Sequence, residues 1–362
     1  MRLMQTYSKK LDFSEYDVYV GLDVHKKSWT VSIMVDDILH KRYSQDANPL
    51  ILANYLSKNF PHGRFHSVYE AGFCGYWIQR ELEELGIDSK VFSPADVPTT
   101  DKERKQKDDG RDSLKLAKAL KNGDMEAIHI PKEKTIQDRM LIRTREALVK
   151  DLTRSKNRVK SMLYFNGIRI PECFESRNGY WSNKFLAWVE QLNMPEESGT
   201  IALQTHLNQV RNNRTQVLYL TKSILQLAKT NRYSDLVTLL RTIPGIGLLT
   251  AMKILTELET ILRFKNIDKL CAYIGLIPMT KSSGQKEVVG DITVRGHHIL
   301  REAFIESAWT AIRKDPALLL KYKELVNRME KNQAIVRIAK KLVIRTAYVL
   351  RHNEPYKMSL VN

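Results

Sequence analysis

Apolar runs and helical patterns alternate along the first third of the chain. Five apolar runs of strand length predict β-strands at residues 19–25, 28–34, 38–43, 66–70 and 90–92. Apolar residues at helical spacing predict helices at residues 49–60, 76–85 and 109–120. Three strands followed by alternating helices and strands is the order of an RNase H-like sheet, in which three antiparallel strands join parallel ones through crossover helices. The pattern therefore predicts an α/β domain of this type.

Two of the predicted strands end in a carboxylate, Asp23 on the first and Glu70 on the fourth. A single Asp at a strand end is more often a turn or cap residue than a catalyst. In an RNase H-like sheet, however, the first and fourth strands are neighbours, so these two carboxylates approach each other. Like charges at this separation repel unless a cation lies between them. We therefore expect Mg²⁺ or Mn²⁺, hard ions that prefer oxygen ligands.

A third part of this predicted site comes from Asp109 and Asp112, three residues apart in the first turn of a predicted helix. Taken alone, they are explained as a helix cap and a favourable charge at the helix N-terminus. Together with Asp23 and Glu70 they predict a four-carboxylate metal site, with Asp108 as the alternative to Asp109. Two such ions activate a nucleophile and stabilise the leaving oxygen in phosphoryl transfer.

The charge balance favours a polyanionic partner. The 362 residues carry a net charge of +17, with a pI near 9.6, and a surface this basic attracts nucleic acid at long range. The alternatives are a basic protein that is merely soluble and one that touches an anionic membrane. No apolar run reaches the roughly 20 residues that span a bilayer, and no signal-peptide core follows Met1, so we expect a cytoplasmic protein without a membrane partner. The cations expected to contact phosphates beside the acidic site are Lys105, Lys107 and Arg111.

Cysteine usage excludes two other classes of protein. The three cysteines, Cys74, Cys173 and Cys271, are far apart and form no CxxC pair. Neither a disulfide framework nor a zinc ribbon is therefore expected.

A basic helical arm is predicted in the middle of the chain. Long helical patterns at residues 135–165 and 201–229 flank a connection at 167–199 that is rich in turn formers and aromatic residues. Two such helices predict an antiparallel coiled coil. The first helix is one-sidedly basic, which favours a surface that binds nucleic-acid backbone, although a solvated face or a dimerisation surface also fits. The arginines expected to contact phosphates here are Arg143, Arg154 and Arg158.

The last third of the chain predicts a mainly helical domain. Residues 239–251 resemble a helix-hairpin-helix, in which the turn containing Gly245 and Gly247 presents backbone N–H groups to a DNA phosphate. A plain tight turn between helices is the alternative. Further on, a polar loop with Ser283 and Gly284 is surrounded by cations, but ordinary loops have the same composition. The cations expected to contact nucleic acid here are Lys281, Lys286, Arg295 and Arg301.

Taken together, these features resemble the insertion-sequence-110 family of transposases, which is similar to the Piv DNA invertases. The order and spacing of the matching motifs hold across nearly the whole chain. These motifs are Gly21-Leu22-Asp23, Glu70-Ala71, Asp109 with Asp112, Ile243-Pro244-Gly245-Ile246-Gly247, Gly275-Leu276-Ile277-Pro278, Ser283-Gly284 and Arg295-Gly296-His297.

The resemblance implies three domains: a RuvC-like domain at 1–130, a coiled-coil arm at 131–235 and a transposase domain at 236–362. It implies a DEDD carboxylate set, here Asp23, Glu70, Asp109 and Asp112, and a catalytic serine, here Ser283. In this family the serine attacks DNA and forms a phosphoserine link, assisted by metal-bound carboxylates of another subunit.

The resemblance also implies partners. Members recognise donor and target DNA through a noncoding bridge RNA, and they work as dimers that pair into a tetramer. The expected setting is a bacterial or archaeal cell, with the protein on the nucleoid when it acts. A covalent intermediate conserves bond energy, in keeping with the absence of a GxxxxGK[ST] loop from the sequence.

Three alternatives remain open at the level of sequence. Ser282 precedes Ser283, so the nucleophile is ambiguous by one position. A RuvC-like nuclease that uses the carboxylates alone predicts an active Ser283→Ala variant. A nucleic-acid-binding protein that has lost catalysis is the third reading, and the presence of all four carboxylates and the serine counts against it.

Overall fold

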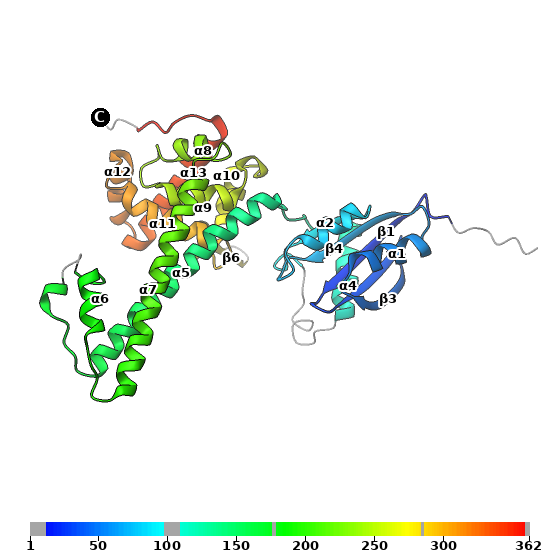
Figure 1. Cartoon of the computed structure of the whole chain (residues 1–362). Helices are drawn as coiled ribbons and strands as arrows, with labels where there is room; N and C mark the ends of the chain where they lie inside the picture. Colours follow the sequence, from blue (N-terminus) through cyan, green and yellow to red (C-terminus); the bar gives the residue numbers. More distant parts are fainter. Residues whose placement is uncertain (1–11, 98–108, 176–178, 284–285, 359–362) are drawn as a thin grey trace, which may run out of the picture. The chain divides into compact units, whose positions relative to one another are not determined.

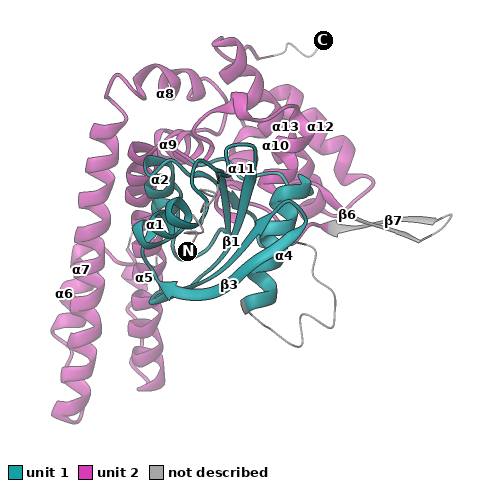
Figure 2. Cartoon of the chain, turned by 90° about the vertical axis from the view of Figure 1, so that its right-hand side faces the viewer, with its two compact units in different colours: residues 1–130 teal, residues 131–362 magenta. Residues whose placement is uncertain are grey.

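The computed structural model describes residues 12–97, 109–175, 179–283 and 286–358, without the side chains of residues 109 and 280–291. Figure 1 traces the chain from the N-terminal strands to the C-terminal helices. The chain divides into two compact units, unit 1 at Met1–Ile130 and unit 2 at Pro131–Asn362, coloured separately in Figure 2.

Unit 1 contains a five-stranded sheet in the order β3-β2-β1-β4-β5. Neighbouring strands run antiparallel from β3 to β1, whereas β4 and β5 continue the sheet parallel to β1. This mixed α/β arrangement confirms the predicted strand pairing and is consistent with an RNase H-like domain. The strands are β1 Asp17–Val24, β2 Ser28–Val35, β3 Ile38–Asp46, β4 Arg64–Glu70 and β5 Asp88–Phe92.

Helices cover both faces of this sheet because each strand alternates its side chains between the faces. Val20 and Leu22 of β1 lie in a core with residues of α1 and α2, whereas Val68 of β4 packs with Leu116 of α4. Figure 2 shows α1 and α2 on one side of the sheet and α4 on the other. The helices of unit 1 are α1 Pro49–Asn59, α2 Trp77–Glu84 and α4 Asp109–Asn122.

Unit 2 is built on two long antiparallel helices, α5 Glu133–Phe165 and α7 Glu197–Leu227, with the short α6 Asn183–Glu190 between them in sequence. Ile142, early in α5, shares a core with residues late in α7 and with the C-terminal helices, and we call this the base core. Val159, late in α5, shares a second core with α6 and the start of α7, which we call the tip core. Both predicted long helices are confirmed within a few residues.

The rest of unit 2 packs around the base core. The last helix, at Lys331–His352, turns an apolar face to this core, where Ile338 and Leu342 are fully buried. No helix among the described residues is long and apolar enough to cross a membrane. The remaining helices are α8 Ser234–Leu240, α9 Leu248–Leu258, α10 Ile267–Ile274, α11 His298–Ala311, α12 Pro316–Val326 and α13 Lys331–His352, with short 3₁₀ helices at Glu172–Phe174 and Ile261–Arg263.

One local expectation was wrong. The segment around Ser283 was expected to be a polar loop, but it forms a hairpin of β6 Pro278–Ser283 and β7 Lys286–Ile292. Ser283 is the last residue of β6, and its backbone pairs with that of Lys286. Residues 280–287 of the hairpin are all polar or glycine and do not alternate with apolar residues, so the sequence carries no strand signal there.

Candidate functional site

The register of the sheet places the first two predicted carboxylates at one edge. Leu22 of β1 pairs with Tyr69 of β4, so Asp23 and Glu70 are the next residues of these two parallel strands. Alternation along the strands puts Asp23 on the same face as Gly21, and Glu70 on the same face as Val68. This is the face that α4 covers.

Helix α4 approaches β1 at a distance that only glycine permits. A Cβ on Gly21 would lie 1.9 Å from the backbone oxygen of Ser113 and 2.6 Å from the backbone nitrogen of Ala117. The buried hydroxyls of Ser32 and Ser113 form a hydrogen bond of 2.8 Å between β2 and α4. The helix is therefore fixed to the sheet one residue after Asp112, which brings that carboxylate to the edge where β1 and β4 end.

Three of the four predicted carboxylates line one cavity. Asp23, Glu70 and Asp112 surround a space of about 160 Å³ together with residues from the turn after β4, among them Phe73. His25 approaches from the chain after β1, with its Nδ1 3.8 Å from Oδ1 of Asp23. We call this space the acidic cavity.

The fourth carboxylate belongs to Asp109, the first residue of α4, and its side chain lies outside the described residues, as does the alternative Asp108. Among the described residues, no group of three or more His, Cys, Asp or Glu side chains is arranged to hold a metal ion. The donor chemistry still fits a hard divalent ion, because the charged groups that converge on the cavity are carboxylates.

A second charged cluster, which the sequence analysis did not identify, lies in unit 2. Glu257 of α9 is fully buried and receives two hydrogen bonds from Arg143 of α5, at 2.7 and 2.8 Å. Arg139 also pairs with it at 3.2 Å, and Nε2 of His297 lies 3.1 Å from its carboxylate. Burial by itself raises the pKa of Glu257, but the hydrogen bonds from His297 and Arg143 outweigh it and lower this pKa to about 2.

This cluster supports the segment that follows the β6–β7 hairpin. His297 is the N-cap residue of α11, and its ring lies 5.4 Å from that of Tyr273. Just before it, Gly296 meets Gly275 so closely that an added Cβ would lie 2.5 Å from the Cα of Gly275. Arg301 donates to the backbone oxygen of Thr293 at 2.8 Å. These contacts hold the chain between β7 and α11 in one conformation.

Family models match both parts of the chain. One described as the transposase IS116/IS110/IS902 family matches residues 237–323, and one for the DEDD domain of IS110 transposases matches residues 20–166. The chain belongs to the IS110 family of transposases. It is thus a transposase of an insertion sequence, an enzyme that cuts and rejoins DNA.

Individual relatives agree with the family matches. The putative transposase y4qE of Sinorhizobium fredii is 26% identical over 300 residues, covering 81% of this chain and 72% of the relative. The transposase for insertion sequence element IS1111A of Coxiella burnetii is 28% identical over 306 residues, covering 80% and 79%. The transposase for IS1533 of Leptospira borgpetersenii is 26% identical over 248 residues, covering 67% and 70%.

The two glycines of the predicted helix-hairpin-helix turn differ in this transposase. Gly245 has a φ of +90°, and a Cβ there would lie 2.2 Å from the backbone oxygen of Ser307 in α11, so it is a packing residue. Gly247 is exposed at the N-cap of α9, with no atom within 4 Å of an added Cβ. Geometrically, only Gly247 is open to a phosphate.

The predicted cationic residues of the transposase also divide into two groups. Arg143 and Arg301 donate to groups inside the protein, which supports a structural role for both. Four others have exposed side chains, and Arg154 among them pairs with Asp151. These exposed residues are Arg111, Arg154, Arg158 and Arg295. The residues that lie outside the described side chains are Lys105, Lys107, Lys281, Ser282, Ser283 and Lys286.

Proposed function

We propose that this transposase exchanges DNA strands with two centres, the acidic cavity of unit 1 and Ser283 at the end of β6. The observation that carries the proposal is the acidic cavity itself. Asp23, Glu70 and Asp112 come from three different elements and line one space, within the part of the chain that matches the DEDD model. A structural explanation of each carboxylate alone does not account for their convergence.

In this proposal Asp23, Glu70, Asp109 and Asp112 hold Mg²⁺ or Mn²⁺. When bound, the ions help to deprotonate an attacking hydroxyl and stabilise the charge on the phosphate and the leaving oxygen. The chain positions these ligands by neutral contacts, namely the close approach of α4 to Gly21 and the Ser32–Ser113 hydrogen bond.

Ser283 acts as the nucleophile. Its Oγ forms an ester bond to a DNA phosphorus as one P–O bond of the strand breaks, and the departing deoxyribose oxygen takes a proton. The reverse step, with the hydroxyl of another strand, restores a phosphodiester and frees the serine. The number of ester bonds is constant, so the exchange needs no ATP.

The partners follow from the charge and from the family. A net charge of +17 and the exposed Arg154 and Arg158 on α5 suit donor and target DNA together with a noncoding bridge RNA. We interpret the α5–α7 pair as a coiled-coil arm and α8–α9 as a helix-hairpin-helix that offers the N–H groups near Gly247 to a phosphate. Two dimers form the active tetramer, with carboxylates of one subunit assisting the serine of another.

A denaturing gel tests the mechanism. Purified protein, Mg²⁺, the noncoding RNA of the element and end-labelled donor and target DNA are combined with wild type, Ser283→Ala, Ser282→Ala and Asp23→Ala. We expect a covalent protein–DNA band that is absent in Ser283→Ala and present in Ser282→Ala. Asp23→Ala should lose the band because the acidic site is incomplete. A parallel reaction without RNA should give no product.

Other patterns on the same gel refute the proposal. Free cleaved DNA without a covalent band, unchanged in Ser283→Ala and lost in Asp23→Ala, identifies a metal-dependent nuclease. DNA that is bound but never cut, under conditions where all variants remain folded, identifies a binding protein without catalysis. A band lost in Ser282→Ala alone moves the nucleophile by one residue.

A further inference from the structure

A second cavity lies in unit 2 at the base of the β6–β7 hairpin. Its volume is about 560 Å³, within the range of about 300–1,000 Å³ that is usual for ligand sites. One wall is apolar and consists of Leu276, Ile277, Pro278 and Ile292. Pro278 and Ile292 are paired at the point where the hairpin leaves the helical core. We call this space the hairpin cavity.

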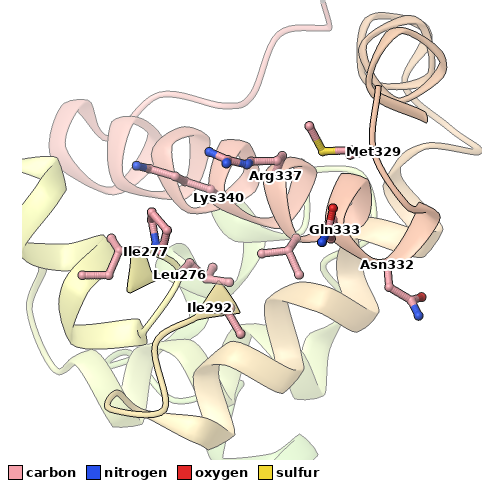
Figure 3. Close-up of a pocket in the computed structure, with 10 residues that line it drawn as sticks. Leu276, Ile277, Ile292, Met329, Asn332, Gln333, Arg337 and Lys340 are labelled. Atoms are coloured by element: carbon pink, nitrogen blue, oxygen red, sulfur yellow. The ribbon is translucent and has the colours of Figure 1, made fainter. Parts of the chain in front are cut away.

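The opposite wall is a stripe on α13 that is polar except for Val336. Gln333, Val336, Arg337 and Lys340 follow one another at helical spacing and line the cavity, with Asn332 beside them. Figure 3 shows Arg337 and Lys340 on the helix side and the isoleucines facing them. The cavity therefore combines an apolar surface with amides and cations.

The polar groups of this stripe have no carboxylate or hydrogen-bonding partner among the described residues. Within the described part of the chain, neither Arg337 nor Lys340 forms an ion pair with a carboxylate, and the side chains of Asn332 and Gln333 make no hydrogen bond. The described lining residues include two cations and no carboxylate. This charge is complementary to an anion, whereas the apolar wall suits a flat or hydrocarbon group.

We propose that the hairpin cavity binds one unpaired nucleotide of the DNA strand that Ser283 attacks. The base packs on the apolar wall, the amides of Asn332 and Gln333 donate to and accept from its edge, and Arg337 with Lys340 contacts the flanking phosphates. Amides serve a base edge because they carry both donors and acceptors. This inference rests on the proposed serine chemistry, and its test separates the two.

The length of β6 determines which nucleotide of the attacked strand reaches the hairpin cavity. Ser283 is five residues beyond Pro278 along β6, which is roughly 17 Å at about 3.3 Å per residue. A stacked DNA strand advances about 3.4 Å per nucleotide, so the bound nucleotide lies about five positions from the attacked phosphate. Only the attacked DNA strand has a phosphate at Ser283 and therefore a nucleotide at a fixed distance from it. This favours DNA over the guide RNA as the occupant.

Photo-crosslinking tests the assignment. The Ser283→Ala protein is mixed with RNA, Mg²⁺ and uncut DNA that carries one 4-thiothymidine, placed in turn at each position near the cleavage site. After irradiation, mass spectrometry locates the crosslinked peptide. We expect crosslinks to residues 276–278, 292 or 329–340 that peak about five nucleotides from the attacked phosphate.

Matched variants test the role of the charges. Arg337→Ala/Lys340→Ala should weaken the crosslink about tenfold and reduce the slope of log K against log salt by about 1.5 to 2, for two lost phosphate contacts. The control Arg328→Ala/Lys341→Ala removes two exposed cations outside the cavity and should leave the crosslink position and yield as in wild type. Val336→Trp fills the cavity without a charge change and should also abolish the crosslink.

Three results overturn the inference. The first is a crosslink that maps elsewhere, and the second is an equal loss in both double variants. The third is a crosslink from 4-thiouridine in the RNA at this site with none from DNA.

Thermal unfolding shows whether Val336→Trp folds. If it does not, the two double variants still test the inference, because Arg337 is exposed and its removal should leave the fold intact. A phosphoserine band without a cavity crosslink refutes the cavity alone, and a crosslink without that band supports nucleotide binding while refuting the serine step.

Discussion

The acidic cavity of unit 1 and the Glu257 cluster of unit 2 are positioned by opposite means. The acidic cavity depends on neutral contacts, the close approach at Gly21 and a serine–serine hydrogen bond. The segment after the hairpin depends on charges, with Glu257 paired to two arginines and a histidine. The difference matches the roles proposed for the two regions. In the proposed function the carboxylates of the acidic cavity bind a metal ion, whereas the buried carboxylate of Glu257 neutralises cations that have structural roles.

The largest effect should come from Gly21→Ala. The new Cβ collides with the backbone of α4, not with a flexible side chain, so the helix must move. We expect unit 1 to lose about 3 kcal/mol, near the upper end for overpacking, and DNA cleavage to fall at least about 100-fold as Asp112 shifts. Thermal unfolding and the gel assay measure both. Gly72→Ala is the control for stability alone, because Gly72 lines the acidic cavity but its added Cβ meets nothing closer than 4.0 Å. Equal effects of both substitutions on stability would refute the packing explanation.

Glu257→Gln should have the next largest effect. It leaves Arg139 and Arg143 without their buried counter-charge, and breaking such a pair typically costs about 3–5 kcal/mol. Chemical unfolding of unit 2 measures the loss. Glu324→Gln, which removes an exposed partner of Lys321, should change stability little. A stable Glu257→Gln protein would show that the cluster does not support the segment after the hairpin.

Lowering the pH should also show, without a mutation, that the stability of unit 2 depends on the charge of Glu257. The pKa of Glu257 is about 2 in the folded protein, against an ordinary value of 4.5. A lowered pKa contributes stability that is complete above about pH 4.5 and is lost as the pH falls toward 2. The contribution is about 3 kcal/mol, so the unfolding midpoint in denaturant should drop across this window. In Glu257→Gln that part of the pH dependence should disappear.

Ser113→Ala should have the smallest effect, about 1–2 kcal/mol, because it leaves the buried hydroxyl of Ser32 without its partner. The Ser32→Ala/Ser113→Ala double variant should recover part of the loss, since neither hydroxyl then remains buried alone. A double-mutant cycle by thermal unfolding gives the coupling energy. Additive losses would show that the two serines act independently.

The sequence predicted much of unit 1 because its signals are local. Strand alternation and chain order are enough to make β1 and β4 neighbours, and with them Asp23 and Glu70. The long α5 and α7 were predicted for the same reason, since residues 135–165 and 201–229 contain neither Gly nor Pro. At the acidic cavity, Asp112 was found as a partner because it stands in the first turn of α4.

The Glu257 cluster was missed because its partners are far apart in sequence. Arg143 is 114 residues from Glu257, and periodicity gives no pairing between such positions. The one signal in the sequence was Glu257 itself, a carboxylate within the mostly apolar helix α9, which indicates a buried charge that needs a partner. The sequence predicted phosphate contacts for Arg143 and Arg301, and it gave no sign of the internal hydrogen bonds that each makes, to Glu257 and to the backbone oxygen of Thr293.

Helix α5 has a mechanical consequence. It is continuous between its anchor in the base core at Ile142 and its anchor in the tip core at Leu163, a lever of about 32 Å at 1.5 Å per residue. A rotation of about 10° at the base displaces the tip by roughly 5–6 Å, more than the 3.4 Å rise of one base pair along DNA. A small adjustment near the hairpin is thus amplified into a shift of more than one base pair at the far end.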